Sequence, residues 1–175
     1  TNTQVANAKK KTLQNLPELF TLSTLQHIAY ESEDKNFRRL CLEYMPLKFS
    51  RRHGDPSRPW NKFSINTQSE VDGSKILDYE GNWRDIFQNW EALAHSFPEF
   101  IESMIHKFLN ATTFDGYNPY RVTKSGFDWE AIEPDDPWSY IGYWGDHQII
   151  YLLKFLEFIE NHKPGKLESY FDNDL

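Results

Sequence analysis

The sequence predicts an all-α fold, and three observations lead to that prediction. Apolar residues recur at three-to-four spacing in most of the periodic segments, which is typical of amphipathic helices. Residues 146–162 are apolar on nearly every side, as in a helix that other helices cover. Two short extended segments, around 62–65 and 75–79, could form strands, but neither alternates cleanly between polar and apolar residues, so we expect little or no strand.

Two predicted helices and a turn-rich loop make up the first part of the chain. Helical spacing of apolar residues covers 22–31 and 34–47, and Asp34 stands where an N-cap is expected. The loop that follows contains two prolines and a glycine. Its basic and aromatic residues form either a solvated turn that joins two subdomains or an anion or sugar site, because guanidinium groups bind phosphate and carboxylate; these residues are Arg51, Arg52, His53, Arg58 and Trp60.

Helical hairpins are predicted for the second part. Asn82 and Asp85 resemble a capping pair that begins a helix ending near His95. Pro98 suits the first turn of the next helix, so the two helices form an antiparallel hairpin. A long connection, 111–136, leads to a helix that Asp146 caps and that runs to His162, and a short last helix covers 166–172.

Length and composition limit the classes of function. At 175 residues the chain is expected to form one compact domain, with an N-terminal helical segment and Arg-rich loop over 1–77 and helical hairpins over 78–175. A net charge of -7 argues against a nucleic-acid binder. The sequence has no apolar run of about 18 residues, so it predicts no membrane span. One cysteine, Cys41, and no signal-peptide pattern favour the cytoplasm.

The segment 81–90 has the side chains that sugar-binding sites use. Arg84, Asp85 and Gln88 lie within two turns of one predicted helix, next to Trp83. Arginine and amide groups bind hydroxyls, a carboxylate accepts hydroxyl protons, and an indole offers a flat apolar face. The alternative is a helix start with a capping Asp and an intrahelical salt bridge, since the helix dipole favours an acid there.

A family resemblance rests on two segments, Trp83-Arg84-Asp85-Ile86-Phe87-Gln88-Asn89 and Gly142-Tyr143-Trp144-Gly145-Asp146-His147-Gln148. Together they resemble the six-hairpin glycosidases over residues 78–172, most closely the cellobiose and chitobiose phosphorylases and the glycogen-debranching-like amylo-alpha-1,6-glucosidases. In that branch an Arg-Asp-x-x-Gln-Asp segment begins one inner helix and a paired-acid segment begins the next. The resemblance implies part of an (α/α) six-hairpin toroid, and the spacing of the predicted helical pairs suits a toroid.

The resemblance also implies roles for individual residues. Arg84 and Asp85 would bind the sugar at the cleavage subsite, and the pocket would be shaped by Trp83, Gln88, Trp129 and Asp146. Asn89 and His147 replace acids of the family pattern, and the chain has no Asp-Trp-Asn-Asp segment, which supplies the family's general acid. The catalytic residue is therefore unknown, and we expect a fragment of a larger chain, which starts here at Thr1.

The implied activity is cleavage of a glycosidic bond by water or phosphate, with an oligosaccharide or glycoside substrate and without metal or organic cofactor. Asp146 with His147 makes a poor ligand set for a metal, and N-capping accounts for the aspartate. Two alternatives to an enzyme stay open. In the first, the chain is a non-catalytic carbohydrate-binding domain, which the missing acid favours. In the second, it is a helical domain whose aromatic residues bind a partner protein.

Overall fold

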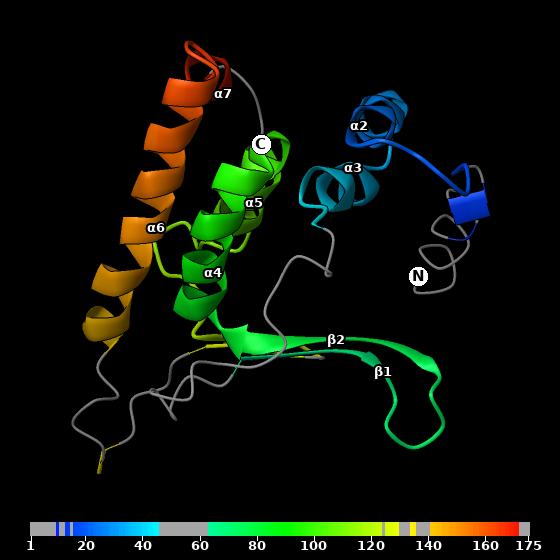
Figure 1. Cartoon of the computed structure of the whole chain (residues 1–175). Helices are drawn as coiled ribbons and strands as arrows, with labels where there is room; N and C mark the ends of the chain where they lie inside the picture. The colour runs from blue at the N-terminus through cyan, green and yellow to red at the C-terminus, as the bar shows by residue number, and fades with distance from the viewer. Residues whose placement is uncertain are drawn as a thin grey trace. The chain divides into compact units, whose positions relative to one another are not determined.

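The structure is a computed structural model that describes residues 10, 13–14, 16–45, 63–123, 125–129, 134–135 and 141–171. The chain divides into two compact units, Thr1–Tyr44 and Met45–Leu175. Each unit has its own apolar core among the described residues. We therefore describe the two units one after the other (Figure 1).

The first unit contains a pair of short helices, α2 (Leu22–Glu31) and α3 (Lys35–Leu42). Asp34 caps α3 as predicted, because its Oδ1 accepts the backbone N–H groups of Asn36 at 2.9 Å and Phe37 at 3.1 Å. The helix ends at Leu42, earlier than the predicted 47. A small buried cluster packs the pair together, formed by Leu25, Ala29 and Cys41, and burial raises the pKa of the Cys41 thiol.

The second unit contains an antiparallel sheet, so the prediction of an all-α chain was wrong. Its four strands lie in the order β1 (Phe63–Gln68), β2 (Lys75–Asn82), β3 (Arg121–Thr123) and β4 (Gly126–Asp128). The predicted six-hairpin toroid, which is built only of helices, is wrong for the same reason. β1 and β2 coincide with the two extended segments around 62–65 and 75–79, which do not alternate cleanly. β3 and β4 escaped notice because they have three residues each, too few for a periodic pattern, and because β2 pairs with β3 across 38 intervening residues of sequence.

The helices α4 and α5 of the second unit lie between β2 and β3 in the sequence, and two more helices follow β4. α4 (Trp83–Ser96) continues directly from β2, and the 3-10 turn η2 (Pro98–Phe100) leads into α5 (Ile101–Asn110). The predicted hairpin with Pro98 at its joint is thus confirmed. The long helix α6 (Ile141–His162) begins five residues before Asp146, so Asp146 lies inside the helix and is not its N-cap. A short helix, α7 (Glu168–Phe171), follows a turn at Gly165.

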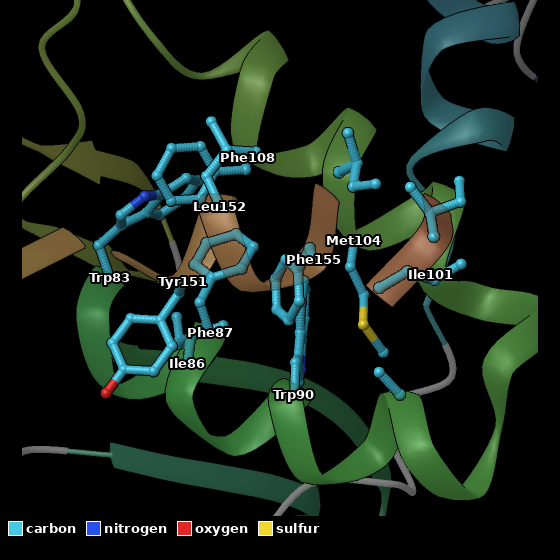
Figure 2. Close-up of a cluster of buried hydrophobic side chains, with 13 residues drawn as sticks. Trp83, Ile86, Phe87, Trp90, Ile101, Met104, Phe108, Tyr151, Leu152 and Phe155 are labelled. Atoms are coloured by element: carbon cyan, nitrogen blue, oxygen red, sulfur yellow. The ribbon is translucent and has the colours of Figure 1, made fainter. Parts of the chain in front are cut away.

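An aromatic core fixes the arrangement of α4, α5 and α6. Phe87 of α4 is 0% exposed and lies at its centre. Its ring is 4.7 Å from Trp83, 5.0 Å from Trp90, 4.9 Å from Phe108 and 5.8 Å from Phe155, measured between centroids. Figure 2 shows these side chains converging from the three helices. Burial of such rings is the main stabilising term for the unit.

Ion pairs show the directions of the three helices. Lys154 of α6 bonds Glu91 of α4 at 2.7 Å, and His95 packs against Phe158 further along both helices, so α4 and α6 run parallel (Figure 1). Lys163, at the end of α6, instead bonds Glu102 at the start of α5 at 2.7 Å. α5 is therefore antiparallel to the other two.

The carboxylate of Glu102 is more enclosed than that of Glu91, since their side chains are 14% and 33% exposed. Burial alone raises its pKa, but the hydrogen bond and charge of Lys163, with the charge of Lys166 at 3.3 Å, outweigh burial and hold that pKa below its ordinary value. The junction of α5, α6 and the turn after α6 is therefore held by a charged group as well as by apolar packing.

Candidate functional site

The residues Arg84, Asp85 and Gln88 all lie on α4, where the sequence placed them. Arg84 and Asp85 are half-buried and Gln88 is exposed. The Nε atom of Arg84 is buried and has no hydrogen-bond partner, which is costly for a guanidinium group. Asp85 does have an interaction within the chain. Gln88 is therefore the most accessible member of the group, and Arg84 is accessible only in part.

The predicted capping pair at the start of α4 does not form. Asn82 occupies the N-cap position, but its side chain makes no capping hydrogen bond. The chain is held there by the sheet, because Asn82 pairs with Arg121 and the Trp83 backbone N–H donates to the Tyr120 carbonyl at 3.0 Å. Strand pairing therefore satisfies backbone groups at the start of α4, where the sequence predicted a capping side chain.

Trp83 is part of the core and not of a binding surface. It is 1% exposed, and its indole ring contacts Phe108 and Phe127, each at 5.8 Å, in addition to Phe87. Figure 2 shows the ring turned into the cluster. An indole buried to this extent presents no face to a sugar, so its contribution is to hold the start of α4 in place.

The remaining predicted site residues are less closely grouped. Trp129 follows β4 and is 48% exposed, so its ring is available to a ligand. Asp146 lies in the second turn of α6, and the position of its side chain is outside what the structure describes. The whole Arg-rich loop also lies outside the described residues, namely Arg51, Arg52, His53, Arg58 and Trp60.

The parallel packing of α4 and α6 brings the two family-like segments to the same end of the unit. Glu91 pairs with Lys154, and His95 contacts Phe158, so the two helices share an offset of 63 residues (154 − 91 = 158 − 95). By this offset, residue 84 is level with residue 147. The sequence was thus informative about which helix ends lie together.

The flank of α4 beside α6 carries a continuous row of polar residues. At 3.6 residues per turn, Arg84, Gln88, Glu91 and His95 fall within about 60° of one another around the helix axis. The row is about 16 Å long at 1.5 Å rise per residue. We call these four residues the polar flank.

A hollow of about 220 Å³ lies at the far end of the polar flank, between α4 and α6. Sequence reasoning missed it because it depends on the pairing of two helices that are far apart in the chain. Only the four-residue spacing of Glu91 and His95 gave a signal for its α4 side. The hollow is lined by Glu91, Ala94, His95, Lys154, Phe155, Glu157, Phe158 and Asn161.

The charged groups of the hollow are partly paired. The hydrogen bond to Glu91 raises the pKa of Lys154, whose ammonium group also lies 5.5 Å from the centre of the Tyr151 ring.

Among the described residues no three His, Cys, Asp or Glu side chains gather as a metal site would require. In the same part of the chain no helix is long and apolar enough to cross a lipid bilayer. What the hollow and flank offer is hydrogen bonding beside an aromatic surface.

Comparison with known proteins gives one match. Residues 1–46 match the family model described as glycoside hydrolase family 149 insertion domain 1. This match relates the chain to a glycoside hydrolase family and covers the first unit, not the segment 78–172 that resembles six-hairpin glycosidases. It does not support the particular phosphorylase and debranching-like branches named from the sequence. No curated protein matches the chain.

Proposed function

We propose that the chain is a non-catalytic part of a larger carbohydrate-active enzyme and that its polar flank binds an oligosaccharide. The match of residues 1–46 to an insertion domain of a glycoside hydrolase family is the observation that carries this proposal. The absence of an Asp-Trp-Asn-Asp segment from the sequence supports a binding role over a catalytic one. The enzyme's catalytic acid would then come from another part of the larger chain.

The chemistry of the flank supports binding of hydroxyl-rich ligands. The guanidinium group of half-buried Arg84 donates hydrogen bonds, and the exposed amide of Gln88 both donates and accepts them. Asp85 stands beside them at the start of α4, where it can accept hydroxyl protons in addition to its contact within the chain. Exposed Trp129 offers an apolar ring for the C–H face of a sugar.

Titration calorimetry of the full chain against a panel of oligosaccharides, with inorganic phosphate included, tests the proposal. We expect binding of at least one sugar to weaken by about tenfold in Arg84→Ala, since a hydrogen bond to a charged donor is worth about 1.5 kcal/mol or more. Arg84→Lys keeps the positive charge but loses the planar guanidinium group, so it should retain only part of the affinity. Lys35→Ala, which removes a cation from α3, is the matched control. Equal affinity in all four proteins would refute the flank as the binding site.

Association with a larger enzyme has a separate test. The intact mass of the native gene product should exceed 20.8 kDa, and the reading frame around this segment should encode an Asp-Trp-Asn-Asp-like stretch. A native mass near 20.8 kDa would contradict that part of the proposal without affecting sugar binding.

A protein-interaction role is the second candidate, and one observation favours it. Three apolar side chains of α6 are about half exposed, namely Ile149, Ile150 and Leu153, at 52%, 47% and 56%. Solvent-exposed apolar groups in a row are typical of interaction surfaces. If no sugar binds while Leu153→Glu abolishes association with the rest of the enzyme, the interaction role replaces the sugar-binding role.

A further inference from the structure

The hollow between α4 and α6 has the size of a site for one small ring. Its volume of about 220 Å³ is below the range of roughly 300–1,000 Å³ that is usual for drug-sized ligands. It opens beside Glu91 and His95, the last two residues of the polar flank. A ligand lying along the flank from Arg84 would reach it about 16 Å away, at 1.5 Å per helical residue.

One side of the hollow is apolar. Ala94 and Phe155 are buried and line it. The half-buried Phe158 ring lies beside them and contacts two neighbouring rings, His95 edge-on at 5.0 Å and His162 stacked at 5.9 Å. An aromatic and apolar surface of this kind suits the C–H groups of a pyranose.

The other side of the hollow carries both donors and acceptors. The amide of Asn161 and the Lys154–Glu91 pair offer both, and the exposed carboxylate of Glu157 offers acceptors. Sugar hydroxyls donate and accept at once, so this mixture fits them. Lys154 and Glu91 cancel in charge, and Glu157 adds a negative charge, which disfavours an anionic ligand.

We propose that this hollow is a second sugar position, which accepts one neutral pyranose unit of the oligosaccharide bound along the polar flank. The inference rests on the proposed function and names the ligand more narrowly. It predicts that uronic acids and sugar phosphates bind this position more weakly than neutral sugars because of Glu157. It also predicts that longer oligosaccharides bind more tightly than single sugars, since one ligand then contacts both Arg84 and the hollow.

The test is calorimetry of the full chain with neutral gluco-oligosaccharides of increasing length and with glucuronate-containing counterparts. Asn161→Ala should weaken binding by about fivefold, the effect of one lost hydrogen bond, while Gln68→Ala on the hairpin leaves it unchanged. Glu157→Gln should improve binding of the glucuronate ligands by about two- to fivefold, as expected for one exposed charge, while Glu99→Gln does not. Circular dichroism verifies that each variant is folded.

The outcomes separate the two proposals. If Arg84→Ala weakens binding but Asn161→Ala and Glu157→Gln do not, the hollow is refuted and the flank stands. If single sugars respond to Asn161→Ala while Arg84→Ala has no effect at any ligand length, the hollow stands and the flank is refuted. If neutral and anionic ligands bind equally in wild type, the selection by charge is wrong. If no sugar of any length binds, both proposals fail.

Discussion

Replacing the buried Phe87 with alanine should destabilise the second unit more than a substitution on the exposed side of α4 would. Phe87 is 0% exposed and contacts four aromatic rings that come from α4, α5 and α6. These three helices position the polar flank and the hollow. Removal of the ring leaves a cavity that rigid neighbours cannot fill, so both the transfer term and the cavity term apply.

The expected loss is about 3–5 kcal/mol in the free energy of unfolding, the range for buried Phe→Ala changes. For a urea slope of about 2 kcal/mol/M, this loss lowers the unfolding midpoint by roughly 2 M. Phe87→Leu retains most of the volume and should cost about 1 kcal/mol, so the pair of variants separates the cavity from the aromatic contacts.

Tryptophan fluorescence in urea is the appropriate measurement. All 6 tryptophans lie after residue 44, in the second unit, so the signal does not report on the first unit. A loss below about 1 kcal/mol for Phe87→Ala, with an unchanged slope, would refute the packing described for α4, α5 and α6.

Three further predictions concern local features. Glu102 has a lowered pKa, so its pairing with Lys163 stabilises the fold at pH values above the ordinary carboxylate pKa. This stabilisation is lost as pH falls through the pKa of the folded state. Glu102→Gln should therefore flatten the pH dependence of the urea midpoint in that acidic range, and an unchanged profile would contradict the pairing. Gly165 has φ of +80°, so Gly165→Ala should cost about 1 kcal/mol while Gly165→Asn costs less, and equal midpoints in thermal unfolding would contradict the strain. Asp34→Ala should cost about 1 kcal/mol in the first unit and speed amide exchange in α3, with Asp34→Ser as the control that keeps a cap.

Helix prediction succeeded where the sequence was locally periodic. The apolar spacing after Pro98 and the capping chemistry of Asp34 act over a few residues, and both are found in the structure. The strands β3 and β4 were missed for the opposite reason. β2 finds its partner β3 only after α4 and α5 have intervened, so no local pattern could reveal that pairing. β1 and β2 coincide with the two extended segments, but their polar and apolar residues alternate too weakly to identify them as strands.

The candidate site was partly visible from the sequence for the same reason. Arg84 and Gln88 are one turn apart, so their shared flank follows from helix geometry alone. The role of Trp83 could not be read in this way, because an indole looks alike in a core and on a binding surface until its neighbours are known. The hollow needed the offset of 63 residues between α4 and α6, which only tertiary packing sets.

The junction of β2 and α4 has a mechanical consequence. No residue separates Asn82, the end of the strand, from Trp83, the start of the helix, and the pairing with Arg121 clamps this point. The start of α4, and Arg84 with it, therefore takes its direction from the sheet. We expect a substitution that disturbs the pairing of Asn82 with Arg121 to displace Arg84 as well, although Arg84 itself is unchanged.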